Sequence, residues 1–330
     1  MTARRALWLL ALIGLLGVAA GLSLAFGARV TGWQDLRNAL AGQVDTMGQA
    51  AVASRIPRTV LAALAGAALG LAGGVMQGVT RNPLADPGIL GVNAGAALAV
   101  VIALATVGLD SAGLYILVAI FGAGVAAVTV YTIASLGAGG ASPLKLALAG
   151  AALSAALASL TTAVVLPRAD IAGLVQSWMV GGVGGATADR IAPVLPFLAL
   201  GLALSLLSAR KLNLLALGED TATSLGEHVW RARAMAALGA VTLCGATTAV
   251  CGPIGFVGLV VPHLARLLFG VDYRWILPAS ALAGAALLLM ADVAGRVAAR
   301  PAELDVGIVT AFIGAPVFIW IVRRRRIAAL

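Results

Sequence analysis

Long apolar runs, separated by short polar or Pro/Gly-rich breaks, follow one another along almost the whole chain. A helix needs about 20 apolar residues to cross the hydrocarbon core of a bilayer. The pattern therefore predicts an all-α, polytopic membrane protein with one transmembrane domain over residues 1–330 and about ten spanning helices. The predicted spans are Ala6–Phe26, Thr59–Val79, Ile89–Val107, Leu114–Ser135, Leu146–Leu166, Ile191–Ser208, Met235–Val250, Phe256–Phe269, Ile276–Val297 and Val306–Val322.

Two segments depart from the simple spanning pattern. Ile171–Val180 is too short to cross and precedes a Gly-rich stretch, so it is predicted to be a short helix at one surface. The span that opens at Phe256 is short and contains Pro262, which favours a discontinuous helix packed inside the protein. Gly and Ala dominate the interiors of the runs, as in LAGAALGLAGG from Leu64, and small residues let helix backbones approach closely in a membrane.

Charge supports the membrane interpretation and sets an orientation. Only 11% of the residues are charged, against roughly a quarter in a soluble domain. The net charge of +9 is spread in single or paired cations between apolar runs, without the basic stripe of a nucleic-acid-binding protein. Lys and Arg concentrate in cytoplasmic loops of membrane proteins. The closing run Arg323–Arg326 therefore predicts a cytoplasmic C-terminus, and an even number of spans places the N-terminus on the same side.

Eight arginines fall outside in this topology, against the positive-inside rule, and three of them lie next to predicted spans: Arg55, Arg58 and Arg296. Burial at mid-bilayer would cost about 2.5–3.5 kcal/mol each, so we expect them at the interface, with Pro57 at a helix start. Interfacial snorkelling accounts for any one of them, whereas three together indicate a docking surface for an acidic partner. Asp292 is the one acid well inside an apolar span, and it is predicted to pair with Arg296 four residues later.

The one extended polar stretch, Leu212–Arg233, lies on the predicted cytoplasmic side. Glu219 and Asp220 suit the N-terminus of a helix, and Gly226 can divide the segment into two short helices. A solvated linker remains the alternative, although connections of this length are usually functional or disordered.

Catalytic and metal-binding chemistry is not indicated. The sequence holds no G-x-x-x-x-G-K-[ST] motif, so it does not predict a phosphate-binding loop for ATP. His228 and His263 have no second ligand at metal-binding spacing, and we interpret them as packing or surface residues. Cys244 and Cys251 fall on one face of a predicted helix, too far apart for a disulfide, and are interpreted as small core residues.

Three long stretches carry a family resemblance. They are SRIPRTVLAALAGAALGLAGGVMQGVTRNPLADPGILGVNAGAALAV, GPIGFVGLVVPHLARLLFG and AELDVGIVTAFIGAPVFIWIVRR. In this order and spacing the chain resembles the FecCD-type permeases of ABC importers for iron chelates, haem and vitamin B12. The resemblance implies a type II importer fold with ten helices and a place in the bacterial cytoplasmic (inner) membrane, but no cofactor. It implies three kinds of partner: two cytoplasmic ATPases, a second permease subunit (identical or a paralogue), and a periplasmic or lipid-anchored substrate-binding protein.

The resemblance also implies roles for single residues. Arg55, Arg58 and Arg296 match family arginines that meet glutamates of the binding protein. Asn82 and Leu84 match residues that line a cytoplasmic gate, and Ser142 in the next inside loop matches the opposing side loosely.

The segment 209–233 matches the coupling helices that dock on the ATPase, with Gly218, Glu219, Asp220 and Gly226 as contact residues.

The substrate stays open between three ligand classes. ELDVG, in which Asp305 stands where the family commonly has Pro, favours a ferric siderophore, whereas WMVGGVGG from Trp178 is closer to vitamin B12 permeases, and haem is a third option. An ion-coupled secondary transporter is the alternative function, but it would bury several ionisable groups near mid-membrane. A polytopic membrane enzyme would need a cluster of His, Asp, Glu or Cys at one depth, and the sequence suggests none.

Overall fold

The computed structural model describes residues 2–88, 90–108, 111–136 and 142–328. Within them it has fifteen α-helices and one 3-10 turn. The elements are α1 (Thr2–Ala25), α2 (Trp33–Leu40), α3 (Met47–Val79), α4 (Val92–Thr106), α5 (Ala112–Ser135), α6 (Pro143–Val165), α7 (Ala169–Met179), α8 (Ala188–Ile191), η1 (Ala192–Val194), α9 (Leu195–Leu207), α10 (Ala209–Ala216), α11 (Glu219–Ser224), α12 (Val229–Cys251), α13 (Val257–Phe269), α14 (Tyr273–Ala298) and α15 (Val306–Ala328).

The predicted spans are recovered. In the part of the chain that the structure describes, seven helical stretches are long and apolar enough to cross a membrane, and three shorter apolar helices correspond to the remaining predicted spans. One of the seven, Ala188–Leu207, combines α8, η1 and α9. Ten is the number of predicted spans, whereas the described residues form fifteen α-helices. The additional helices are short and do not cross by themselves: α2, α7, α8, α10 and α11. Of these, α7 confirms the short surface helix predicted over Ile171–Val180.

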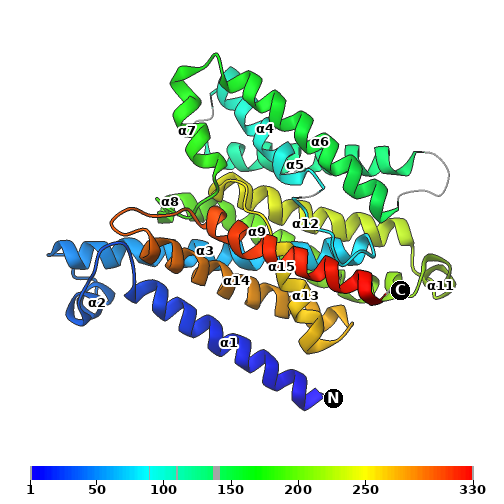
Figure 1. Cartoon of the computed structure of the whole chain (residues 1–330), viewed down its shortest axis with the longest axis horizontal. Helices are drawn as coiled ribbons and strands as arrows, with labels where there is room; N and C mark the ends of the chain where they lie inside the picture. Colours follow the sequence, from blue (N-terminus) through cyan, green and yellow to red (C-terminus); the bar gives the residue numbers. More distant parts are fainter. Residues whose placement is uncertain (1, 89, 109–110, 137–141, 329–330) are drawn as a thin grey trace.

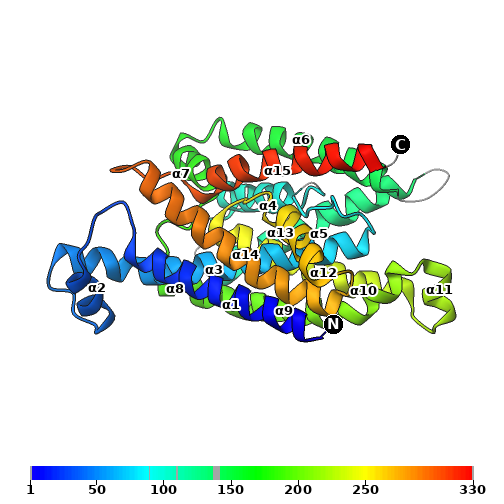
Figure 2. The same cartoon turned by 60° about the horizontal axis from the view of Figure 1, so that its bottom comes forward.

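The long helices run side by side along the longest axis of the molecule (Figures 1 and 2). α2, α8 and the loop between α14 and α15 lie at one end, which we call the outer end. Both ends of the chain and α11 lie at the opposite end, which we call the inner end. The two termini therefore lie at the same end of the helix bundle, as an even number of spans requires.

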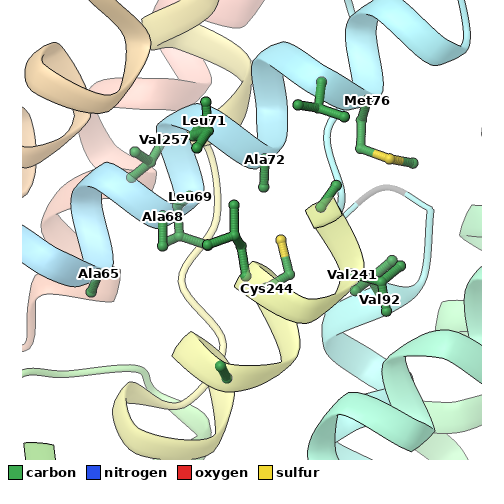
Figure 3. Close-up of a cluster of buried hydrophobic side chains, with 14 of the residues drawn as sticks. Ala65, Ala68, Leu69, Leu71, Ala72, Met76, Val92, Val241, Cys244 and Val257 are labelled. Atoms are coloured by element: carbon green, nitrogen blue, oxygen red, sulfur yellow. The ribbon is translucent and has the colours of Figure 1, made fainter. Parts of the chain in front are cut away.

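Glycines bring α3 into backbone contact with α14. A Cβ added to Gly66 would lie 2.3 Å from the carbonyl oxygen of Gly284, and one added to Gly284 would lie 2.2 Å from that of Gly66. Close packing of this kind holds helices together where lipid supplies no hydrophobic drive. On its other side α3 packs against α12, where Cys244 lies among Leu69 and Ala72 (Figure 3). Both cysteines are free and buried, as predicted.

α3 begins at Met47, well before the predicted Thr59. The side chain of Thr46 accepts a hydrogen bond from Gln49 N at 3.2 Å, and the Gln49 side chain accepts from Thr46 N at 3.2 Å. This reciprocal capping box fixes the helix start. Pro57 consequently lies inside α3, and its predicted place at a helix start is wrong.

The short helix predicted from Phe256 is α13, but it continues through Pro262, so the predicted break is wrong; a buried glutamine joins α13 to α3. Pro262 has no N–H, so the carbonyl of Gly258, four residues earlier, loses its helical donor. Gln77 of α3 donates to that carbonyl at 3.2 Å, and its own oxygen accepts a hydrogen bond from the guanidinium of Arg266. Gln77 is 1% exposed, so these bonds replace hydration that the side chain lacks.

Candidate functional site

The three outward arginines predicted from the sequence converge on one cavity. Arg55 and Arg58 come from α3, Arg296 from α14, and Glu303 from the loop that follows α14. All four side chains line a cavity of about 250 Å³ at the outer end. Together with Asp292 we call these residues the outer cluster.

Asp292 is the centre of the outer cluster. Its carboxylate is fully buried and accepts hydrogen bonds from Arg58, at 3.0 Å from Nε and 2.8 Å from Nη2, both to Oδ1. The other oxygen, Oδ2, lies 2.8 Å from Nη2 of Arg296. The predicted pair between Asp292 and Arg296 is confirmed, but Asp292 is shared with a second arginine. One buried carboxylate thus faces two guanidinium groups.

Arg296 makes its remaining hydrogen bonds to residues at the end of α1. Its Nη1 donates to the carbonyls of Ser23 at 3.1 Å and Phe26 at 3.0 Å, and its Nη2 donates to the Ser23 hydroxyl at 2.9 Å. The last carbonyls of a helix have no donor within the helix, and the negative end of its dipole favours a cation. Arg296 is only 1% exposed, and it holds α1 against α14.

Arg55 binds the same end of α1 from α3. Its Nη1 donates to the carbonyls of Leu24 at 3.0 Å and Ala25 at 2.9 Å, and its Nη2 donates to that of Arg29 at 2.7 Å. Arg55 is 5% exposed. Arg55 and Arg296, two of the three arginines predicted to form an outward docking surface, are therefore buried. Their N–H groups donate to carbonyls at the end of α1.

Arg58 is the member of the trio that reaches the surface. Its side chain is 13% exposed, and its Nη1 lies 2.6 Å from Oε2 of Glu303, whose side chain is 41% exposed. Sequence reasoning did not single out Glu303, because nothing in its spacing relates it to a residue 245 positions earlier. Two residues further on, burial raises the pKa of Asp305, the carboxyl group of the ELDVG motif.

At the inner end, Glu219 accepts from two arginines. Its Oε1 lies 3.0 Å from Nη2 of Arg81, which follows α3, and 2.7 Å from Nη2 of Arg233 in α12. These side chains are 22–46% exposed. We call Arg81, Glu219 and Arg233 the inner cluster.

The polar stretch forms short helices, as predicted. α10 and α11 are separated by Gly218 at φ 109°, and α11 ends before Gly226 at φ 85°, so both glycines take backbone conformations that a side chain disfavours. Glu219 and Asp220 occupy the first turn of α11, where acidic residues complement the free N–H groups. The predicted break at Gly226 is thus confirmed, and a second break at Gly218 separates α10 from α11. Binding of an ATPase to this segment stays a prediction.

The predicted gate residues lie in a turn after α3 and at the start of α6. Asn82 folds back so that its Oδ1 accepts from Leu84 N at 3.0 Å, and both residues are half-buried. Ser142 is the N-cap of α6 and accepts from Lys145 N at 3.3 Å. These bonds account for the local structure without a gate, so the gate role also stays a prediction.

Asp272, which the sequence did not single out, fixes the inner end of α14. It caps α14 through Arg274 N at 3.0 Å and accepts from Asn213 Nδ2 of α10 at 2.7 Å. The hydrogen bond from the Arg274 side chain is the main reason that the pKa of Asp272 falls to about 2.

Comparisons with known proteins agree with this arrangement. A model of the FecCD transport family matches residues 15–324. The ferric enterobactin transport system permease protein FepD of Escherichia coli (strain K12) is 46% identical over 323 residues, covering 97% of this chain and 96% of FepD. The hemin transport system permease protein HmuU of Yersinia pestis is 40% identical over 278 residues, covering 82% of each chain.

Solved structures give the same answer for the fold. An inward-facing structure of a metal-chelate type ABC transporter superposes with a TM-score of 0.79 at 29% identity, covering 97% of this chain and 99% of the other. The resemblance of the three quoted stretches, the recovered spans and these matches lead to one conclusion. The chain is a multi-pass transmembrane permease and belongs to the FecCD transport family.

Proposed function

We propose that this chain is the permease subunit of an ABC importer for an iron chelate, with a ferric siderophore favoured over haem and vitamin B12. The observation that carries the proposal is the 46% identity to a ferric enterobactin permease over 97% of the chain. The ELDVG motif favours the same ligand class. Translocation then proceeds by alternating access of a pathway to the two sides of the membrane, and the permease does no covalent chemistry on its cargo.

Two cytoplasmic ATPases supply the energy in this proposal. The chain has no phosphate-binding motif of its own, and its helical polar segment at the inner end offers a surface for another protein. Gly218, Glu219, Asp220 and Gly226 are the proposed contact residues, and Asn82, Leu84 and Ser142 form the proposed gate. The basic run Arg323–Arg326 supports a cytoplasmic inner end and hence two cytoplasmic termini.

A periplasmic or lipid-anchored substrate-binding protein docks at the outer cluster. Arg58 is the proposed contact group, because it is the arginine of the trio that reaches the surface and the outer cluster holds three arginines against two carboxylates. Arg55 and Arg296 are 5% and 1% exposed, so they contribute by charge and by holding the end of α1. A second permease subunit, identical or a paralogue, completes the assembly in the lipid bilayer.

Reconstitution tests this function. The permease, its ATPase and its binding protein are placed in proteoliposomes, and uptake of ferric enterobactin, ferric citrate, haemin and cobalamin is measured in parallel with ATP hydrolysis. We expect ATP-dependent uptake of a ferric siderophore that requires the binding protein. Uptake that follows a proton or sodium gradient without ATP would favour the secondary transporter instead.

Labelling tests the orientation independently of the substrate. In a chain whose Cys244 and Cys251 are replaced by Ala, single cysteines are placed at the exposed positions Ser54 and Asp220. A membrane-impermeant maleimide should reach Ser54→Cys from outside in intact cells, and Asp220→Cys only after the membrane is opened. Labelling of both positions from outside would contradict the proposed topology.

A further inference from the structure

Arg81 has an unusual backbone for its residue type. It follows the C-cap Thr80 of α3 at φ 50°, the left-handed region that glycine normally fills at this position of a helix end. The helix end is closed around it: Arg81 N donates to Gly78 O at 3.3 Å, and Asn82 N donates to Gln77 O at 3.1 Å. The chain thus keeps an arginine where glycine would be easier. Strain of this kind points from an observed geometry to a role of the side chain.

The side chain of Arg81 crosses to another element. Its Nη2 lies 3.0 Å from Oε1 of Glu219, in the first turn of α11. The same oxygen of Glu219 is also held by Arg233 of α12 at 2.7 Å, so loss of Arg81 would not by itself release it. The ion pair therefore joins the turn after α3 to the polar segment at the inner end.

Arg81 also stands next to the residue that shapes this turn. Asn82 follows it directly, and the Asn82 side chain closes the turn onto Leu84 N at 3.0 Å. A displacement of Glu219 pulls on Arg81, and the shared peptide bond passes that displacement to Asn82. With side-chain exposures of 43% and 46%, the pair between Arg81 and Glu219 adds little to folding stability.

We propose that Arg81 is a positioning residue that links two segments through its ion pair with Glu219. It transmits movement of the coupling segment, residues 209–233, to the gate turn, Asn82–Leu84. The inference rests on the proposed function, because that function assigns the roles of the two segments. It adds a specific link between them that predicts a loss of coupling without a loss of folding.

The test compares Arg81→Gly, Arg81→Lys and wild type in the complete reconstituted complex, with the chelate that the wild type takes up among the four tested above. Glycine suits the backbone and removes the ion pair. We expect uptake per ATP hydrolysed to fall about fivefold in Arg81→Gly, the ratio that corresponds to the upper range for an exposed ion pair. Arg81→Lys keeps the charge and should retain most of the coupling.

Two further measurements separate coupling from folding. The melting temperature of Arg81→Gly in detergent should equal or exceed that of wild type, because glycine relieves the left-handed backbone. Arg81→Asn also tolerates the left-handed backbone, removes the ion pair and leaves Glu219 untouched, so it stands in if Arg81→Gly folds poorly. The matched control is Arg274→Gln, which removes another exposed inner-end arginine paired with a carboxylate and should couple like wild type.

The outcomes distinguish this inference from the proposed function. Wild-type complex without ATP-driven uptake would refute the function itself. Normal uptake in the wild type, together with wild-type coupling in Arg81→Gly and Arg81→Asn, would overturn the role of Arg81 alone. Equal loss in Arg81→Lys and Arg81→Gly would overturn it as well, because the effect would then not depend on the charge.

Discussion

The outer and inner clusters are built from the same residue types but differ in burial. Asp292 is fully buried between Arg58 and Arg296, whereas the side chain of Glu219 is 46% exposed between its two arginines. Removing one partner of a buried ion pair leaves an uncompensated charge in a low-dielectric environment, while an exposed pair exchanges its partner for water at little cost. The comparison teaches that the outer cluster supports the fold and that the inner cluster is free to rearrange.

The largest expected effect is at the centre of the outer cluster. Asp292→Asn leaves the buried Arg296 and the nearly buried Arg58 without their carboxylate, and we expect a loss of about 3–5 kcal/mol of stability. The melting temperature in detergent and the yield of folded protein measure this effect. Asp170→Asn, which removes an exposed carboxylate paired with Arg168, is the control and should melt like wild type. Equal melting temperatures of Asp292→Asn and wild type would remove the contrast between the clusters.

A second prediction concerns the buried link between α3 and α13. Gln77→Leu leaves the Gly258 carbonyl without its donor and the Arg266 guanidinium without its acceptor, so we expect a loss of about 1–3 kcal/mol. Thermal unfolding measures it. The exposed Gln176→Leu in α7 is the comparison and should be close to neutral. An unchanged melting temperature in Gln77→Leu would show that water replaces the lost hydrogen bonds of the Gly258 carbonyl and the Arg266 guanidinium.

A third prediction uses pH at the inner end. The pKa of Asp272 is lowered to about 2 in the folded chain, so its stabilising effect is complete above its ordinary pKa of 3.8 and is lost as the pH falls toward 2. Asp272→Ala should cost about 1 kcal/mol at neutral pH through the lost helix cap. The difference from wild type should shrink between about pH 4 and pH 2. A difference that stays constant over this range would assign the effect to packing.

The smallest effect on stability is expected at the surface of the outer cluster. Glu303→Gln should change stability by less than about 1 kcal/mol, because its carboxylate is 41% exposed. It also frees Arg58 from an internal carboxylate that competes with an acidic partner, so the binding protein should bind up to about fivefold more tightly. Surface plasmon resonance on the reconstituted permease measures this affinity. Weaker binding would mean that Glu303 itself contacts the partner.

Most of the fold could be predicted from hydrophobic runs alone. The ten predicted spans correspond to the seven long and three short apolar helices, since hydrocarbon length sets the length of each run. The early start of α3 was missed, although the Thr46 and Gln49 capping box is a readable signal. Without the capping box, the predicted helix start lay at Pro57, and Arg55 lay before it.

The site was predicted less completely, because its chemistry depends on contacts between distant segments. Sequence spacing identified the pair of Asp292 and Arg296, which lie one turn apart on one helix. It could not show that carbonyls of α1 take up the donors of Arg55 and Arg296, or that Glu303 reaches Arg58. These contacts exist only once α1, α3 and α14 are packed together.

The glycine contact between α3 and α14 has a consequence for how the two partners influence each other. Backbones in direct contact, at Gly66 with Gly284 and at Gly70 with Ser280, resist sliding, so the two helices form a single rigid strut. That strut carries Arg58 toward its outer end, and Arg81 follows its inner end. Linkage between two ligands is reciprocal. In the proposed importer, the factor by which nucleotide on the ATPase changes the affinity for the binding protein must therefore equal the factor by which the binding protein changes the affinity for nucleotide, and either measurement yields both.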